Sequence, residues 1–242
     1  TPTISNGLDL FRGKRSAEGF TKLPFVSANS KLPPIVGIAK TAKIKASSPS
    51  DMTPDLTSKI RLDYYEYMSK KNLIHKQAPS VCLIEDLDWP NLIGSFWGEV
   101  NVALHKGLGL AGTITNGLLR DLDAIDKNYQ VLANSIGPSH AYVHVLEFGG
   151  TIDVHGIKVH DGDIIHADQH GVVIIPEDAL SILKEAIDSI YAQTYSNWEI
   201  IFYDNASNDN SSNIAKSYDN KLQYFYIKKK ISLGEARNNA LL

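Results

Sequence analysis

Residues 109–121 read GLAGTITNGLLRD, and this stretch decides the fold class. Its first half is a short apolar run between glycines, which is the pattern of a buried strand. Asn116-Gly117 is a strong turn signal that ends this strand. We predict that a helix begins directly afterwards, near Arg120 and Asp121.

Upstream of this stretch, predicted strands and helices alternate. The spacing of apolar residues predicts, in chain order, a strand at 35–44, a helix at 55–71, a strand at 80–85 and a helix at 99–106. The run at 80–85 is apolar almost throughout, so we expect it to be buried on both faces. Residues 1–11 are predicted to form a short helix with Ser5 as its N-cap, and 12–34 a loop.

Downstream of residue 131 the pattern changes to closely spaced strands. Apolar runs separated by glycine and aspartate turns predict strands at 142–148, 151–154, 157–159, 163–166 and 172–175. Alternating helices and strands followed by clustered strands indicate an α/β domain with a mixed sheet. After Pro176 the pattern changes again, and we predict two domains, 1–180 and 181–242.

The composition excludes several classes of protein. Hydrophobic residues make up 43% of the 242 residues, which is enough for a packed core. A net charge of −3 argues against nucleic acid as a partner, because phosphate binders are normally basic. No apolar run approaches the roughly 18 residues of a membrane span, and no signal peptide is visible. We therefore expect a cytoplasmic protein that binds no membrane.

The single cysteine, Cys82, excludes a disulfide framework and a zinc site built from cysteines. It lies in the apolar run 81–84, where it is either a buried, inert thiol or a nucleophile. We favour the inert thiol, because an apolar environment disfavours the thiolate.

Two short motifs indicate chemistry. Residues 94–101 form a glycine-bounded loop that opens a helix, which leaves backbone N–H groups free to bind a carboxylate or phosphate. Arg120 offers a planar fork for a carboxylate, and Asp121 offers hard oxygen ligands suited to Mg²⁺ or Mn²⁺. The alternatives are an ordinary strand-to-helix turn and an acidic first helical turn favoured by the helix dipole.

A third cluster places His166, Asp168 and His170 at alternate positions. On a strand they would share one face and could meet a metal. Because Gly171 follows at once, we favour a strand end and a turn in which Asp168 accepts backbone hydrogen bonds.

Together, the first two motifs resemble the RraA-like family, which includes the class II 4-hydroxy-4-methyl-2-oxoglutarate aldolases. The resemblance covers residues 1 to about 180, and its landmarks are residues 35–39, 94–100, 112–121 and 161–173. It implies a swivelling α/β/β domain with a mixed sheet, assembled as a homotrimer or hexamer.

The resemblance also implies a role for each motif residue. Asp121 would ligate Mg²⁺ or Mn²⁺, and Glu99 would hold water bound to that metal. Arg120 would act with Glu99 in catalysis by gripping the oxygens of a 2-oxo acid. The carboxylate of this substrate would be bound by a set made of Gly98, Val100, Asn101 and Arg120, in which the backbone amides of Val100 and Asn101 donate.

The implied activity is that of a metal-dependent lyase that releases pyruvate. It would cleave 4-hydroxy-4-methyl-2-oxoglutarate, decarboxylate oxaloacetate, or do both, with the metal acting as a Lewis acid on the enolate. Ala124 stands where many aldolase relatives carry a further carboxylate. Two alternatives therefore stay open: a non-catalytic regulator that binds a ribonuclease, and another metal-dependent reaction on a 2-oxo or hydroxy acid.

Residues from about 183 resemble the beginning of a family 2 glycosyltransferase. The resemblance rests on residues 183–201 and on the run from 204 to 238, and it implies that Asp204 and Asp209 lie near a nucleotide. The predicted elements here are a helix at 178–192, a strand at 198–203, a helix at 210–218, a strand at 222–227 and a helix from 233.

The strand at 172–175 is needed by both resemblances. The first domain needs it as its last strand, and the glycosyltransferase fold needs it as its first. One strand cannot serve two sheets in this way. Our hypothesis is that 183–242 are a truncated fragment fused to the first domain. Such a fragment would transfer no sugar and would be the less stable part.

Overall fold

The computed structural model describes residues 1–70, 78–177, 179, 187–207, 211–232, 235, 236, 239 and 240. The chain separates into two compact units, Thr1–Pro176 and Glu177–Leu242. Each unit has a hydrophobic core of its own. Within these residues, no helix is long and apolar enough to cross a membrane.

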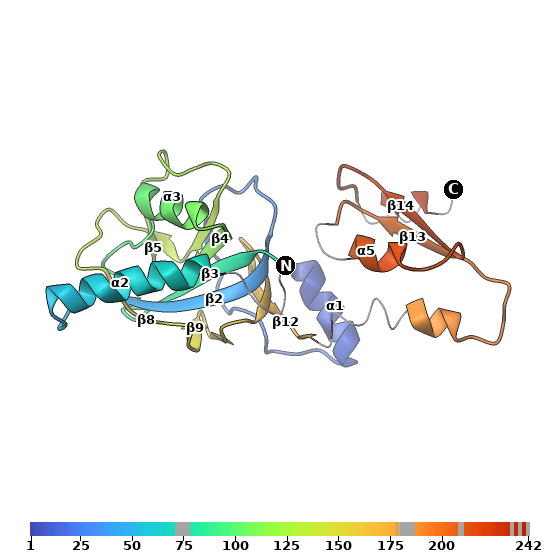
Figure 1. The fold of residues 1–242 in the computed structure, drawn as a ribbon, viewed down its shortest axis with the longest axis horizontal. Coiled ribbons are helices and arrows are strands. Elements are labelled where there is room, and N and C mark those ends of the chain that lie inside the picture. The colour runs from blue at the N-terminus through green and yellow to red at the C-terminus, as the bar shows by residue number, and fades with distance from the viewer. Residues whose placement is uncertain are drawn as a thin grey trace. The chain divides into compact units, whose positions relative to one another are not determined.

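An eight-stranded mixed sheet forms the centre of the first unit (Figure 1). Its strands are β1 (Val26–Ser27), β2 (Ile35–Lys45), β3 (Ser80–Asp86), β4 (Leu110–Thr115), β6 (Gln130–Ala133), β8 (His144–Phe148), β11 (Ile164–Asp168) and β12 (Gly171–Ile175). The strand order is β1-β6-β4-β3-β2-β11-β12, and β8 pairs with β2 as well. Strands β2, β3, β4 and β6 pair in parallel, and the outer pairings are antiparallel.

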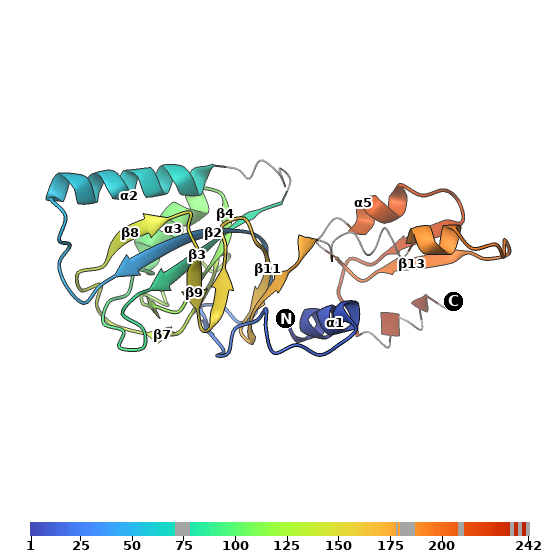
Figure 2. The same cartoon turned by 90° about the horizontal axis from the view of Figure 1, so that it is seen from below.

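Strand β3 shows why the sheet is covered on both faces. Cys82 and Ile84 belong to the core beneath helices α2 (Pro54–Ser69) and α3 (Glu99–Gly107). Val81 and Leu83 belong to the core beneath the hairpin of β9 (Ile152–Val154) and β10 (Ile157–Val159). Successive side chains of a strand point to opposite faces of the sheet, so a strand that is apolar throughout is buried on both faces. The predicted α/β/β layering with a mixed sheet is confirmed, with α2 above the sheet and β9 below it in Figure 2.

The environment of Cys82 agrees with an inert thiol. Its side chain is fully buried, and its Sγ lies 3.6 Å from the Tyr64 hydroxyl. Burial raises the pKa of Cys82 to about 12. The thiol therefore stays protonated at neutral pH and is a poor nucleophile.

The predicted helices at 55–71 and 99–106 are confirmed as α2 and α3. Helix α2 begins after Thr53, whose side chain accepts a hydrogen bond from Leu56 N at 3.3 Å. Pro54 occupies the first turn, where its missing N–H has no helical partner to lose. The local sequence alone therefore sets the beginning of this helix.

Two N-terminal predictions are wrong in detail. Helix α1 spans Pro2–Arg12, and Ser5 N already donates to Thr1 O at 3.0 Å, so Ser5 lies inside the helix and is not its N-cap. Residues 12–34 were predicted as loop, but they contain β1, in which Val26 pairs with Ala133 of β6. A two-residue edge strand is defined by its partner, and its own sequence carries no signal for it.

The second unit contains a parallel pair of strands, β13 (Ile200–Asp204) and β14 (Leu222–Tyr226), with helix α5 (Ser211–Lys216). Ile187, Ala215 and Leu222 are the buried residues of its core. The predicted strands at 198–203 and 222–227 are confirmed. The predicted helices at 178–192 and from 233 lie largely outside the described residues.

Strand β12, which both resemblances need, belongs to the first unit. It pairs with β11 over its whole length, from Ile164 opposite Ile175 to Asp168 opposite Gly171. Its side chains Val172 and Val173 are buried. The strand therefore completes the sheet of the first unit.

Candidate functional site

The beginning of α3 meets the segment that carries Arg120 and Asp121 at Gly98. Gly98 is the N-cap of α3, with an extended backbone at φ −162° and ψ −172°. A Cβ atom at this position would lie 2.5 Å from Asp121 Oδ2 and 3.1 Å from Arg120 Cγ. Close contact with these two side chains, not backbone strain, therefore requires glycine here.

The helix predicted near Arg120 and Asp121 is wrong. The chain instead forms β5 (Leu118–Leu119), paired with β7 (Ser135–Ile136), and then a turn. Asp121 has φ 57°, in the left-handed region, which a right-handed helix cannot include. Arg120 N donates to Trp97 O at 2.9 Å, and this bond holds the turn against the residues that precede α3.

The charged groups of this site are close together. Asp121 Oδ2 accepts a hydrogen bond from Glu99 N at 3.3 Å and lies 3.6 Å from Arg120 Nε. The Arg120 and Asp121 side chains are about one-third exposed, at 34% and 38%. Arg120 Nε is itself buried and has no hydrogen-bond partner among the described residues. The guanidinium of Arg120 thus lies beside Asp121 with its Nε buried, while the side chain as a whole reaches solvent.

These residues border an open hollow of about 660 Å³. Glu99, Arg120 and Asp121 line one part of it, and Ile136 and Gly137 line another. The volume lies within the range of pockets that hold small ligands, about 300–1,000 Å³. The structure therefore brings together three of the side chains that the sequence singled out.

Val100 and Asn101 directly follow Glu99, which lines the hollow, but they do not line it themselves. Val100 is exposed, and the side-chain amide of Asn101 donates to Phe96 O at 2.6 Å. Val102 N makes the first helical hydrogen bond, to Gly98 O at 3.0 Å. The amides of Val100 and Asn101 therefore precede that bond, as expected for a helix N-terminus.

The donor set suits a hard cation that keeps most of its water. Asp121 and Glu99 both carry carboxylates and both line the hollow, and the backbone N–H of Glu99 donates to Asp121 Oδ2. Among the described residues, no group of three or more His, Cys, Asp or Glu is arranged to hold a metal ion. Mg²⁺ is commonly bound through one or two carboxylates with water in its other positions, so this pair fits such an ion.

A buried polar chain supports α3 and was not predicted from the sequence. His105 is fully buried, and its Nδ1 lies 2.6 Å from Asn101 O and its Nε2 lies 2.6 Å from the Tyr64 hydroxyl. A carbonyl only accepts, so Nδ1 donates and Nε2 accepts from Tyr64. Burial lowers the pKa of His105 to about 4, so the ring is neutral at pH 7. A lone histidine in a helix gives no sequence signal for this role.

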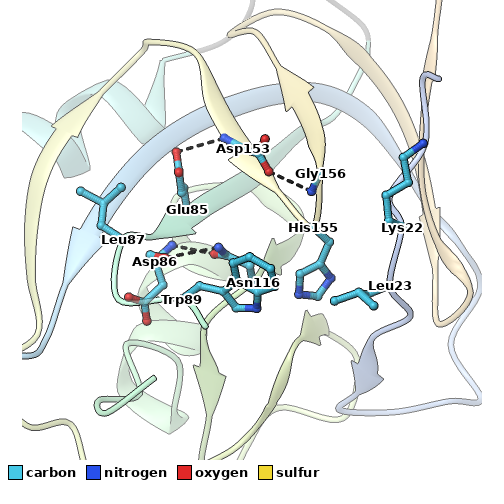
Figure 3. Close-up of a pocket in the computed structure, with 10 residues that line it drawn as sticks. All are labelled: Lys22, Leu23, Glu85, Asp86, Leu87, Trp89, Asn116, Asp153, His155 and Gly156. Atoms are coloured by element: carbon cyan, nitrogen blue, oxygen red, sulfur yellow. Dashed lines mark hydrogen bonds between the residues drawn. The ribbon is translucent and has the colours of Figure 1, made fainter. Parts of the chain in front are cut away.

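A second pocket in the first unit, of about 530 Å³, contains residues that sequence reasoning missed (Figure 3). Asp86, Asn116 and His155 line it, although they come from distant parts of the chain. No local motif connects them, so only the fold could reveal this pocket.

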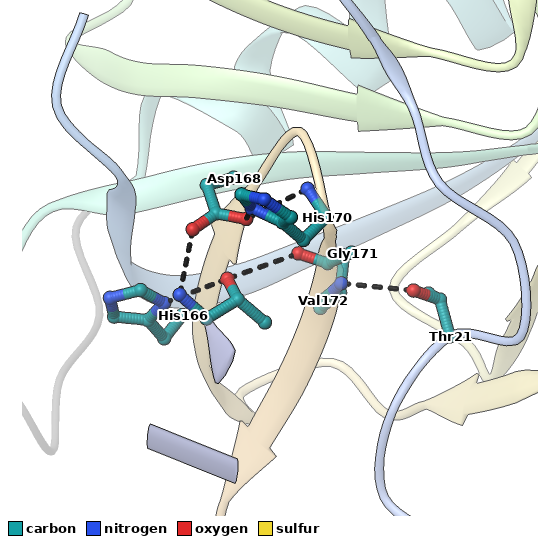
Figure 4. A network of polar contacts seen from close by, with 7 residues as sticks. Thr21, His166, Asp168, His170, Gly171 and Val172 are labelled. Atoms are coloured by element: carbon teal, nitrogen blue, oxygen red, sulfur yellow. Dashed lines mark hydrogen bonds and ion pairs between the residues drawn. The ribbon is translucent and has the colours of Figure 1, made fainter. Parts of the chain in front are cut away.

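The cluster at 166–170 is a strand end and a turn, as predicted (Figure 4). Asp168 Oδ1 accepts from His170 N at 2.8 Å, and Oδ2 accepts from the Thr1 amino group at 2.7 Å. Burial alone would raise the pKa of Asp168, but these hydrogen bonds lower it to about 2. The Asp168 carboxylate therefore accepts hydrogen bonds from groups of the protein itself.

In the second unit, Asp204 is buried at the end of β13. It accepts hydrogen bonds from the Tyr224 hydroxyl at 2.5 Å and from Ser207 N at 2.7 Å. Its carboxylate thus joins β13 to β14 and to the turn that follows. Asp209, its predicted companion, lies outside the described residues.

Comparison with solved structures agrees with the fold. A structure described as novel cellulases from gut-associated microbes superposes with a TM-score of 0.61 at 17% identity, over 79% of this chain and 80% of that one. RraAS2 of Streptomyces coelicolor, described as an unusual member of the RNase ES inhibitor RraA family, superposes with a TM-score of 0.56 at 17% identity. That match covers 78% of this chain and 87% of RraAS2. At these identities the likeness concerns the fold alone.

Among curated proteins, an uncharacterized glycosyltransferase of Rickettsia typhi is 47% identical over 55 residues, which is 22% of this chain and 17% of that protein. Protein DlpA of Legionella pneumophila is 30% identical over 87 residues, 35% of this chain and 14% of that protein. The chain thus matches less than a fifth of the length of either relative.

Family profiles divide the chain as the resemblances did. The profile described as Aldolase/RraA matches residues 1–174, and that of glycosyl transferase family 2 matches residues 172–242. The two matches overlap within β12. The chain belongs to the Aldolase/RraA family through its first unit and continues into a fragment of a family 2 glycosyltransferase.

Proposed function

We propose that the first unit is a divalent-metal-dependent lyase that releases pyruvate from 2-oxo acids. The observation that carries this proposal is the contact at Gly98, where the absence of a side chain lets Asp121, Arg120 and the beginning of α3 meet. A guanidinium and carboxylates then border one hollow at the beginning of α3. A 2-oxo acid needs these groups, because it carries a carboxylate beside a polarisable carbonyl.

The two candidate reactions share one bond change. In both, the C3–C4 bond breaks, one carbon away from the 2-oxo group, and its electron pair stays on C3, where the 2-oxo group delocalises it as the enolate of pyruvate. With 4-hydroxy-4-methyl-2-oxoglutarate the other product is a second pyruvate, and with oxaloacetate it is CO₂. One arrangement of binding groups therefore serves both substrates.

Each residue has a defined part in this proposal. Arg120 binds the oxygens of the 2-oxo acid, and its charge stabilises the negative charge that develops there. The amides of Val100 and Asn101 receive the carboxylate. Glu99 holds the water that takes the proton from the C4 hydroxyl when the aldol bond breaks.

Asp121, with Glu99 behind it, is the proposed holder of Mg²⁺ or Mn²⁺. When bound, the ion would supply Lewis-acid polarisation of the 2-oxo group. The hard carboxylate oxygens suit such an ion, and members of this family are often metal-dependent. Fixation of Asp121 by Glu99 N would reduce the conformational entropy that is lost when the ion binds.

The test is pyruvate release from oxaloacetate and from 4-hydroxy-4-methyl-2-oxoglutarate, by the full chain and by Arg120→Ala and Arg120→Lys. We expect Arg120→Ala to lower kcat/KM by about a hundredfold or more for both substrates, since one charge-stabilising donor is worth about that much. Arg120→Lys should keep only part of the wild-type activity, because lysine lacks the planar fork of arginine. Equal activity of all three proteins would contradict the assigned site.

The alternative is a regulator that binds a ribonuclease, as the description of RraAS2 states for its family. Exposed apolar side chains beside the hollow favour a protein partner, Val100 at 68% and Ile136 at 54% exposure. Absence of turnover in folded protein, together with retention of a ribonuclease E-type enzyme on the immobilised chain, would support this alternative. Exchange of Val100 for Asp should then abolish retention, whereas Arg120→Ala should not.

A further inference from the structure

The pocket of about 530 Å³ shown in Figure 3 is separate from the hollow beside Asp121. Its walls come from residues 22–23, from the end of β3 and the residues that follow it (85–87 and Trp89), from Asn116 after β4, and from the hairpin (Asp153, His155 and Gly156). The proposed lyase reaction uses none of these residues. The pocket therefore needs its own explanation.

Asp86 presents an acceptor with no partner. The residue is 1% exposed, and its Oδ2 has no hydrogen-bond partner among the described residues. The remaining polar groups of Asp86 are held firmly: Oδ1 accepts from Asp88 N at 3.0 Å, and its backbone N–H donates to Asn116 Oδ1 at 2.6 Å. A buried carboxylate oxygen left unpaired is costly. Its retention within a pocket indicates a ligand that donates a hydrogen bond.

His155 closes one side of the pocket. It is 3% exposed, its Nε2 lies 3.0 Å from Asn134 Oδ1, and its ring stacks on that of Phe25 with the ring centres 4.8 Å apart. Burial lowers the pKa of His155, although a hydrogen bond with the Leu23 backbone acts in the opposite direction. The ring is therefore held by its neighbours and forms a fixed wall of the pocket.

Flat aromatic surface and negative charge complete the pocket. The Trp89 indole is 41% exposed, and its centre lies 6.1 Å from that of the His155 ring. Glu85, Asp86 and Asp153 contribute carboxylates, against the single cation Lys22 among the lining residues. The pocket thus combines an aromatic wall, an unpaired carboxylate oxygen and an excess of negative charge, which together favour a planar cation.

We propose that this pocket binds a small planar organic cation that donates N–H hydrogen bonds, an amidine or a guanidine. One of its N–H groups would pair with Asp86 Oδ2, and its flat face would lie against Trp89. A volume of about 530 Å³ is ample for a molecule of this size. The proposal is independent of the lyase activity.

The experiment is calorimetric titration of the full chain with benzamidine at pH 8. Burial raises the pKa of Asp86 to about 6, so the carboxylate is ionised at this pH. Benzamide, the uncharged analogue, and benzoate, the anion, are titrated in parallel. We expect saturable binding of benzamidine, and binding at least about tenfold weaker for the other two, because a hydrogen bond to a charged group contributes that much.

Three variants assign the site. Asp86→Asn and Trp89→Leu should each weaken benzamidine binding by about tenfold or more. Asp123→Asn, which removes a carboxylate from the other hollow, is the matched control and should bind like wild type. Trp89 is partly exposed, so its variant tests the pocket even if Asp86→Asn fails to fold. Undetectable binding by wild type, equal binding of benzamide, or wild-type affinity in Trp89→Leu would overturn the proposal.

Discussion

Gly98 illustrates how one residue controls the candidate site. Exchange for alanine would place a Cβ 2.5 Å from Asp121 Oδ2, so the carboxylate must move. We expect Gly98→Ala to lower kcat/KM for pyruvate release by about tenfold or more, with a loss of about 1–3 kcal/mol in the free energy of unfolding. Steady-state kinetics and urea unfolding measure the two effects.

The matched control is Gly107→Ala, at the other end of the same helix. A Cβ there would meet nothing within 4 Å, so activity should stay at the wild-type level. Stability should stay constant or rise by up to about 1 kcal/mol, because alanine favours the helix over glycine. Equal loss of activity in both variants would show that α3 tolerates no added side chain. Displacement of Asp121 would then not be the cause of the loss in Gly98→Ala.

His105 gives a pH-dependent stability with a defined sign. Burial lowers its pKa in the folded state to about 4, below the ordinary value of 6.5. The unfolded chain therefore takes up the proton first, and the contribution of His105, complete above pH 6.5, is lost as the pH falls from 6.5 to 4. The slope is at most about 1.4 kcal/mol per pH unit.

The measurement is the difference in unfolding free energy between wild type and His105→Gln at several pH values. A difference is needed because Asp86 acts in the opposite direction: burial raises the pKa of Asp86 to about 6, so its protonation stabilises the fold in the same range. The difference should shrink as the pH falls from 6.5 to 4. A difference that stays constant over this range would refute the burial of His105 as a neutral ring.

At the scale of elements, β12 decides where the first unit ends. Val172 is fully buried in the core shared with β11 and the hairpin. We expect Val172→Ala to destabilise the first unit by about 2–3 kcal/mol and to leave the second unit unaffected. Urea unfolding separates the units, because Trp89 and Trp97 report on the first and Trp198 on the second. A shift in the Trp198 signal instead would assign the strand to the glycosyltransferase fragment.

The elements also show what could be predicted from sequence. Strand β3 and helix α3 were predicted correctly, because an apolar run and a glycine N-cap act locally. The helix predicted at Arg120 is wrong, because Asp121 adopts a positive φ that a right-handed helix cannot include. The pocket around Asp86 and His155 could not be predicted, since it joins residues about 70 positions apart that share no motif.

At the scale of the whole chain, the two units differ in the size of their cores. Among the described residues, the first unit has two clusters of buried residues, whereas the second has one, made of Ile187, Ala215 and Leu222 beside a two-stranded sheet. So small a core contributes little stability. We expect the second unit to unfold at a lower urea concentration than the first. Comparison of the tryptophan fluorescence of wild type and Trp198→Phe measures the two transitions separately. Simultaneous unfolding of both units would contradict this ranking.

The most direct test of the lyase proposal compares two neighbouring aspartates. Pyruvate release from 4-hydroxy-4-methyl-2-oxoglutarate is measured with Mg²⁺, and again after EDTA, for wild type, Asp121→Asn and Asp123→Asn. We predict that EDTA abolishes the wild-type activity and that Asp121→Asn lowers it by about a hundredfold or more, whereas Asp123→Asn retains it. Turnover that survives EDTA, or that depends on Asp123 and not on Asp121, would contradict the site at Gly98.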